Sequence, residues 1–425
     1  MTMSFSRAWR GTMLVAAIAA LAGSASAQTP VTLGVADRSN DAVSVAAAGQ
    51  FVALVWGARA SGGIDVYSAI SRNGGTSFSA QVRVNAILFD ASVGGEQPPH
   101  IVLVPRKGRE PELVVVWTAK RAEGSRLLAA RSTDGGVTFS ASTVVPGSAA
   151  AGSRGWESIA VGRGGSVYAL WLDHRKLDIG APTRGAVAGG GPSAPIFDPV
   201  ERAALSQLYF ASLDGRVAAK GITGGVCFCC KTSMVTAPDG GVLAVWRHVF
   251  PGDLRDIAFT TSRDGGRTFS APMRVSEDHW EFDGCPDNGP TVAVDGARRI
   301  HVAWPSPADV KNPMVMALFY AMSSNGQPFT PRIKIPTNGP AGHVQIVTEA
   351  DGNVVLAWEE MSSTGRTIRL ARANTLANGQ IVLRSVGSTV AGKYPSMAVT
   401  SGGALVAWAQ PVNGVSTIAV SRVPR

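Results

Sequence analysis

Four cysteines are the most specific local feature of the sequence. Cys227, Cys229 and Cys230 lie together in the segment CFCCKTSMV, and Cys285 precedes a proline in HWEFDGCPDNGP. Four cysteines in an oxidising compartment allow two disulfides in three pairings, and one feasible arrangement joins Cys285 to Cys229 and Cys227 to Cys230. Thiolates could instead bind copper or zinc, because soft ligands favour Cu(I). We expect disulfides and no cofactor, with a copper, zinc or redox site as the alternative.

A second group of residues is polar and mostly cationic. Its members are Arg59, His100, Arg247, His248, Asp287 and His343. Each lies where one of the repeated strands described next begins or ends, so we expect the side chains to converge on one concave mouth. Such convergence is typical of ligand sites, and arginine can clamp a carboxylate or a phosphate. The group predicts a small anionic or glycan-like ligand.

A short apolar strand ending in tryptophan recurs seven times along the chain. Its tryptophans are Trp56, Trp117, Trp171, Trp246, Trp304, Trp358 and Trp408. Each copy is preceded by another short strand and a turn and is followed by a third strand, with β-branched and apolar runs bounded by turn residues. No segment shows a sustained helical period of apolar residues. We expect the tryptophans to pack between neighbouring units.

Repeats of this length predict an all-β protein, a β-propeller of four-stranded antiparallel blades. Seven units indicate seven blades. The early strand at 31–35 is expected to complete the last unit and close the ring, since an open edge invites aggregation. The domain is expected to span 28–425, with an insertion at 173–205 in the third blade that is too long for an ordinary turn.

The amino terminus resembles an export signal. Arg7 and Arg10 precede an apolar run from Met13 to Ala22, and Ala25-Ser26-Ala27 suits a cleavage site, so 1–27 is predicted to be a signal peptide and the location periplasmic or secreted. The formal charge of +9 comes from dispersed residues, which argues against nucleic acid as a partner. No later stretch is long enough for a membrane span. We expect a monomer.

Three turns repeat one pattern, and a fourth is a shortened copy. They are SRNGGTSF (71–78), STDGGVTF (132–139), SRDGGRTF (262–269) and SSNGQPF (323–329). In each, Ser and Asp or Asn can accept backbone N–H bonds, the glycines permit positive φ, and the aromatic residue can anchor the loop. This pattern resembles the Asp-box (BNR) repeat of the sialidase superfamily, over nearly the whole mature chain. The resemblance implies that these turns are structural and lie away from the ligand face.

The same resemblance implies where catalysis would occur. Sialidases use an arginine triad, a Tyr–Glu nucleophile pair and an Asp acid/base, and the matching positions suggest Tyr394 with Glu157 and Asp65, alongside Arg59 and Arg247. The Arg-Ile-Pro signature of the family is absent, and the sialidase fold has six blades, which is the alternative architecture here. We therefore expect a propeller without sialidase activity, with an exo-sialidase or related glycoside hydrolase as the alternative.

The cysteine segments carry a narrower resemblance. CFCCKTSMV, WRHVFPGDLRDIAF and HWEFDGCPDNGP are similar to an exported, sialidase-like group that pairs Cys-x-Cys-Cys with Cys-Pro. The sequence thus predicts an exported Asp-box propeller that binds an anionic or glycan-like ligand at its axial mouth. A periplasmic copper or redox protein built on the cysteines is a further alternative.

Overall fold

The protein is described here from a computed structural model. The structure describes residues 29–178, 199–282, 288–309, 311–324, 328–375, 381–389, 391–412 and 414–425. The predicted signal peptide, Cys285 and Asp287 lie outside these residues.

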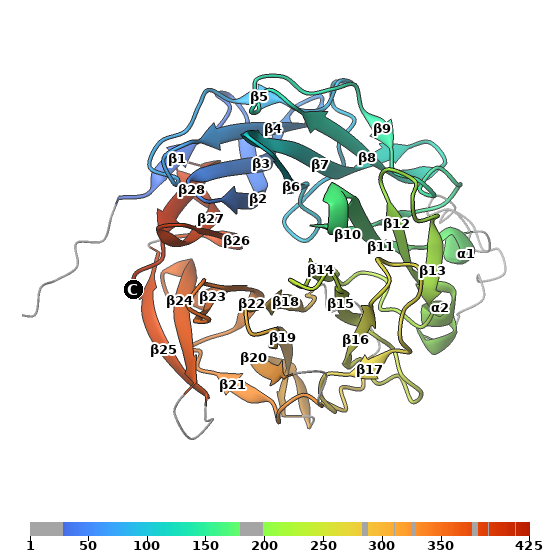
Figure 1. Cartoon of the computed structure of the whole chain (residues 1–425). Helices are drawn as coiled ribbons and strands as arrows, with labels where there is room; N and C mark the ends of the chain where they lie inside the picture. Colours follow the sequence, from blue (N-terminus) through green and yellow to red (C-terminus); the bar gives the residue numbers. More distant parts are fainter. Residues whose placement is uncertain are drawn as a thin grey trace, which may run out of the picture.

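Seven four-stranded antiparallel sheets stand around a central axis, as the repeats predict (Figure 1). Blade 1 contains β2 (Ser39–Ala48), β3 (Phe51–Ala60), β4 (Gly63–Ser71) and β5 (Val82–Arg83). Blade 2 contains β6 (His100–Arg106), β7 (Arg109–Arg121), β8 (Gly124–Ser132) and β9 (Thr143–Val144). Blade 3 contains β10 (Arg154–Val161), β11 (Val167–Asp173), β12 (Gln207–Ser212) and β13 (Lys220–Thr223). Each inner strand is the first of its blade.

The remaining blades follow the same order. Blade 4 contains β14 (Ser233–Thr236), β15 (Val242–Arg247), β16 (Ile257–Ser262) and β17 (Met273–Arg274). Blade 5 contains β18 (Thr291–Val294), β19 (Ile300–Asp309), β20 (Asn312–Ser323) and β21 (Ile333–Ile335). Blade 6 contains β22 (Ala341–Thr348), β23 (Val354–Ser362), β24 (Gly365–Thr375) and β25 (Ile381–Ser388). Blade 7 contains β26 (Lys393–Thr400), β27 (Gly403–Val412), β28 (Val415–Arg422) and, as its outer strand, β1 (Val31–Leu33).

The ring closes through pairing of the two ends of the chain. β1 lies antiparallel to β28, with Val31 opposite Val420 and Leu33 opposite Ile418. The predicted closure by the strand at 31–35 is therefore confirmed, although the strand itself is shorter. The pairing fills the edge that β28 would otherwise leave open.

The recurring tryptophans fill the seams between blades. All seven are buried, and each belongs to an apolar cluster shared with the preceding blade. Trp56 of blade 1, for example, packs with Leu405 and Ile418 of blade 7. Its indole N–H donates to Asn40 Oδ1 over 2.9 Å, so the polar atom of this large apolar side chain is also satisfied. The predicted structural role of these residues is confirmed.

The repeated turns share one set of hydrogen bonds. In the second of them, Ser132 Oγ accepts from the Gly136 amide over 2.9 Å, and Asp134 Oδ1 accepts from the Thr138 amide over 3.0 Å. The turns at 71–78 and 262–269 repeat both bonds. Gly135 and Gly136 have φ of 74° and 86°, a conformation that costs glycine least. The fourth turn lies partly outside the described residues.

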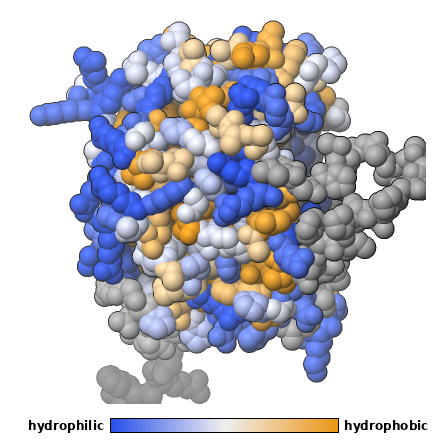
Figure 2. All heavy atoms as spheres, turned by 90° about the vertical axis from the view of Figure 1, so that its right-hand side faces the viewer, coloured by the Kyte–Doolittle hydropathy of each residue, from blue (hydrophilic) through white to orange (hydrophobic). Residues whose placement is uncertain are grey.

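In the part of the chain that the structure describes, α-helices occur only around the insertion. α1 (Arg175–Asp178) and α2 (Pro199–Leu205) flank residues 179–198, and η1 (Arg163–Gly165) is a single turn between β10 and β11. On the side of the molecule that carries α1 and α2, hydrophilic and hydrophobic residues are interspersed (Figure 2). None of the described helices is both long and apolar enough to cross a membrane.

Candidate functional site

A cavity of about 210 Å³ lies on the propeller axis, and the inner strands or the loops before them in all seven blades line it. Hydroxyl and amide side chains dominate its polar lining: Ser44, Ser158, Thr232, Ser233, Thr291, Gln345 and Ser396. Some of these hydroxyls also tie blades together. Ser396 Oγ accepts from the Val45 amide over 3.2 Å, and Ser233 Oγ accepts from the Val292 amide over 3.1 Å. The cavity wall is thus held by hydrogen bonds between adjacent inner strands.

Four inner strands begin with the same irregularity. β2, β10, β22 and β26 each contain a bulge relative to the neighbouring strand. The first bulged residues are Ala42, Trp156, His343 and Tyr394, with φ between 52° and 57°. Bulges redirect side chains, and positive φ in a residue other than glycine is costly, so the surrounding structure must hold it. At His343 and Tyr394 the bulges place an imidazole and a phenol in the cavity wall.

His343, Tyr394 and Glu96 form a contacting group of titratable side chains. The His343 and Tyr394 rings lie 4.7 Å apart between centroids, and His343 Nδ1 is paired with Glu96 Oε1. Burial raises the pKa of Tyr394, and the nearby charges of Glu96, Glu359 and Asp41 raise it further. A Cβ on Gly95 would lie 2.2 Å from the Tyr394 ring, so this position requires glycine. Because its pKa is raised, the Tyr394 phenol is neutral at neutral pH and can donate a hydrogen bond.

Sequence reasoning found His343 and Tyr394 but missed Glu96. Glu96 lies in the loop before β6, in the segment VGGEQPPH at 93–100. The paired glycines mark a close approach of backbone to another group, which is the signal that could have drawn attention to it.

Lys231 provides the positive charge of the cavity. It follows Cys230 and lines the cavity together with His100. Burial, together with the smaller effect of the Lys231 charge, lowers the pKa of His100 to about 4. His100 is therefore a neutral ring at neutral pH, and Lys231 is the cation in this part of the wall.

The rim beside Tyr394 carries balanced charges. Lys393 Nζ lies 2.7 Å from Asp41 Oδ2, and Glu359 accepts a bond from the Tyr394 amide over 3.2 Å. Glu359 is also paired with Arg366 over 2.6 Å. These groups fix the backbone of the bulge.

A groove of about 620 Å³ meets the cavity at His343. It runs between blades 5 and 6, where Asn288, Glu359 and Arg366 supply polar groups and Met361 supplies an apolar one. Asn288 Oδ1 accepts from the His343 amide over 3.1 Å, which joins the groove wall to the bulge. The cavity and the groove therefore share one wall residue, His343.

A hollow wider than the axial cavity lies elsewhere. It measures about 670 Å³ and is lined by turn residues of blades 3 to 5, including Arg163, Asp239 and Arg298. These turns lie at the far ends of the inner strands, and Arg298 is paired with Asp239 on the exposed surface. Because the hollow holds no buried titratable group among the described residues, we assign the site to the axial cavity.

Two of the three predicted catalytic residues lie outside the axial cavity wall. Asp65 is fully buried in β4, where Arg38, Asn85 and the Phe89 amide donate to it over 2.6, 2.9 and 2.7 Å. Burial acts to raise its pKa, but these hydrogen bonds outweigh that effect and lower it. Glu157 is buried between blades 2 and 3, and Thr118 Oγ1 donates to it over 2.9 Å. Neither carboxylate lines the cavity next to Tyr394.

Of the predicted cationic residues, some line the axial cavity and others lie outside its wall. His100 and His343 line the cavity, whereas Arg59 is exposed at the end of β3. Arg247 is buried and donates to the carbonyls of Arg255 and Pro305 over 2.8 and 2.6 Å. Burial, together with the smaller effect of the Arg274 charge, lowers the pKa of His248 to about 4, so this ring is neutral at neutral pH.

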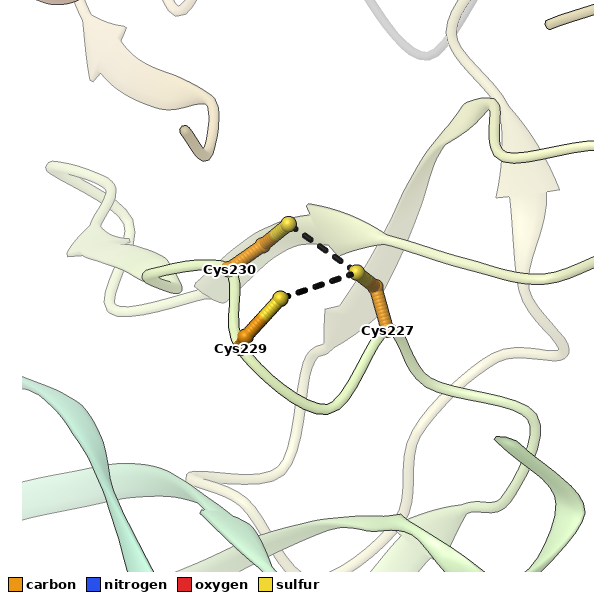
Figure 3. A group of neighbouring side chains, drawn as sticks. All are labelled: Cys227, Cys229 and Cys230. Atoms are coloured by element: carbon orange, nitrogen blue, oxygen red, sulfur yellow. Dashed lines mark hydrogen bonds between the residues drawn. The ribbon is translucent and has the colours of Figure 1, made fainter. Parts of the chain in front are cut away.

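Three of the cysteines form one compact cluster in the turn before β14 (Figure 3). Cys227 Sγ lies 3.0 Å from Cys230 Sγ and 3.9 Å from Cys229 Sγ, and all three side chains are buried. Cys227 and Cys230 are free thiols, whereas Cys229 is disulfide-bonded. Cys285 lies outside the described residues, so the expected pairing of Cys229 with it stays a prediction. The sequence placed these residues together, and the structure brings their sulfur atoms into contact.

Comparisons with known proteins show the fold. No protein-family model matches the chain, and no curated protein matches it in sequence. The polysaccharide lyase Uly1 superposes with a TM-score of 0.55 at 10% identity, over 92% of this chain and 91% of that one. The α-L-arabinofuranosidase Arb93A of Fusarium graminearum gives 0.51 at 10% identity, over 93% and 98%.

A sialidase of Trypanosoma rangeli is also similar, at 12% identity over 81% of this chain and 55% of that one. Its TM-score of 0.45 is too low to support any argument about the site. The chain therefore has the β-propeller fold, with seven four-stranded blades.

Proposed function

We propose that this protein is an exported propeller that binds an anionic, glycan-like ligand in its axial cavity. The observation that carries the proposal is Lys231. Lys231 lines the cavity, and its charge lies close enough to His100 to lower the pKa of that ring. No ion pair joins Lys231 to a carboxylate of the described residues, whereas the neighbouring Lys393 is paired with Asp41. A cation left unpaired in a polar cavity favours a ligand that brings the negative charge.

The rest of the lining suits a sugar. Hydroxyl and amide groups from several blades can bond to ligand hydroxyls, and the Tyr394 and His343 rings offer flat faces. A volume of about 210 Å³ is small for a ligand pocket and suits a single sugar unit, while the adjoining groove can hold the next units of a chain. The polysaccharide lyase and the arabinofuranosidase that share the fold support a ligand of this class.

The binding proposal is tested by calorimetric titration of oligosaccharides that contain uronic or sialic acid, each compared with its carboxyl-reduced form. We expect the acidic form to bind at least tenfold more tightly, because a hydrogen bond to a charged group contributes about 1.5–3 kcal/mol. Lys231→Met should remove this preference. Lys107→Met, at an exposed turn of blade 2, should leave it unchanged. Equal affinity for acidic and neutral sugars, or binding unaffected by Lys231→Met, would contradict the proposal.

Cleavage of the bound glycan is a second candidate function. The specific observation in its favour is the contact between Tyr394, His343 and Glu96, because a phenol, an imidazole and a carboxylate within reach of one another can transfer protons to and from a substrate.

If cleavage occurs, Tyr394→Phe should lower turnover about 10²-fold while leaving ligand affinity nearly intact. Release of reducing ends or of unsaturated sugars from the oligosaccharide that binds measures turnover. Tyr67→Phe in β4, away from the cavity, is the matched control. Undiminished turnover in Tyr394→Phe would exclude this role for the phenol.

A further inference from the structure

Cys227 and Cys230 have the geometry of a redox pair. The turn between β13 and β14 spaces them as Cys-x-x-Cys and brings their free Sγ atoms to 3.0 Å (Figure 3). A disulfide bond is about 2.05 Å long, so a shift of roughly 1 Å would allow the two sulfur atoms to bond. Two thiolates on one zinc ion would stand about 3.8 Å apart, given bonds of about 2.3 Å and tetrahedral angles. The distance between these two sulfurs therefore favours a disulfide over a shared metal ion.

The charges around Cys227 favour its thiolate form. Arg247 and Arg255 are both buried, and Arg255 Nη1 donates to Cys227 Sγ over 3.7 Å. Arg255 also pairs with Asp253, whereas Arg247 forms no ion pair with a carboxylate of the described residues and stacks over Trp280. A buried guanidinium without a counter-ion costs several kcal/mol. A thiolate at Cys227 offsets that charge.

The two sulfurs are also unequal. A hydrogen bond from the Cys230 thiol lowers the pKa of Cys227 to about 6, against the effect of burial and with help from Arg247 and Arg255. Burial raises the pKa of Cys230, and the neighbouring Cys227 raises it further. Cys227 is thus the thiolate and Cys230 the protonated thiol, the division of roles that Cys-x-x-Cys redox sites use.

Burial limits which oxidant can reach the pair. Both residues are 1% exposed, so a protein disulfide cannot approach their sulfur atoms, and only an oxidant close to water in size could reach them. A small peroxide meets this condition and oxidises thiolates selectively.

We propose that Cys227 and Cys230 form a peroxide-sensitive dithiol that closes to a disulfide. The Cys227 thiolate attacks one oxygen of hydrogen peroxide, and the O–O bond breaks to give Cys227 sulfenic acid and hydroxide. Cys230 sulfur then attacks Cys227 sulfur, which forms the S–S bond and releases the sulfenic hydroxyl. The thiol proton combines with that hydroxyl as water. The two sulfurs lose two electrons in total, and the peroxide gains them.

The test uses the folded mature protein, exposed to peroxide, unfolded in acid and then alkylated with N-ethylmaleimide. Before peroxide, two cysteines should be alkylated, Cys227 and Cys230. After it, neither should react, and peptide mapping should find the two joined with a mass loss of two hydrogens. Dithiothreitol should restore both thiols.

Two variants separate the roles of the sulfurs. Cys230→Ser should stop at a Cys227 sulfenic acid that dimedone traps, and Cys227→Ser should leave Cys230 unreactive to peroxide. Peptide mapping of the unsubstituted protein gives the main result. The proposal can therefore be tested even if a variant fails to fold. Three results would each overturn the proposal. They are two alkylatable thiols after peroxide, oxidation of Cys230 in Cys227→Ser to the same extent as in the unsubstituted protein, and copper or zinc bound stoichiometrically by the pair.

Discussion

Replacing Asp173 by alanine should lower the free energy of unfolding by about 3–5 kcal/mol, because it leaves a buried arginine without its carboxylate. Asp173 is the last residue of β11 and is fully buried. Its Oδ2 accepts from Arg154 Nε over 3.3 Å, from the Trp171 indole over 3.0 Å and from Arg175 over 2.7 Å. The Arg154 side chain is itself 0% exposed, so water cannot replace the lost partner.

Chemical unfolding monitored by tryptophan fluorescence measures this loss. Glu123→Ala is the matched control, because Glu123 pairs with Arg126 over 3.6 Å on the exposed surface, where ion pairs contribute about 0–1 kcal/mol. Asp173→Asn keeps the shape and removes the charge, so its cost should lie between the two. A loss in Asp173→Ala no larger than that of Glu123→Ala would show that the buried pair does not stabilise blade 3.

Glu157→Gln should stabilise the protein at pH 8 by up to about 3 kcal/mol and leave it nearly unchanged at pH 4. Burial raises the pKa of Glu157 from 4.5 to about 7, while the hydrogen bonds at Glu157 and Thr118 act in the opposite direction. Between these pH values the folded state binds more protons than the unfolded state. Stability is therefore lost as the pH rises from 4.5 through 7, and the neutral amide avoids that loss.

Denaturant unfolding of both proteins across pH 4–8 gives the comparison. His100 and His248 have lowered pKa values and make stability fall as the pH drops from 6.5 towards 4, but they act equally in both proteins and cancel in the difference. Glu123→Gln, at an exposed site, should show no such dependence. A difference between Glu157→Gln and the unsubstituted protein that does not grow with pH would refute the raised pKa.

The architecture could be predicted from the sequence because its signals are local and repeated. Trp-ended strands recur seven times, and each tryptophan packs against the preceding blade as expected. The turn at 132–139 shows the predicted hydrogen bonds, since Ser, Asp and glycine at fixed spacing determine the conformation of a short turn by themselves. Closure by the strand at 31–35 followed from the missing outer strand of the last unit.

The composition of the site was decided by the tertiary structure. From the sequence, Arg247, His100 and Tyr394 were all expected at the ends of blade strands. In the structure, Arg247 is buried against Trp280, whereas His100 and Tyr394 line the cavity. The difference depends on strand bulges and on packing between blades, neither of which has a local sequence signature. Glu96 comes from a loop of blade 2 and meets His343 of blade 6 only because the ring brings them together.

The cysteines show both contributions in one segment. Their spacing in the sequence limited the chemistry to disulfide, metal or redox reactions, because sulfur at that spacing can reach sulfur. The 3.0 Å contact of Cys227 with Cys230 is local to one turn, whereas the two buried arginines beside Cys227 come from the end of β15 and the segment before β16. Sequence alone determined which atoms could react, and the folding of blade 4 around the turn decided which of them carries the charge.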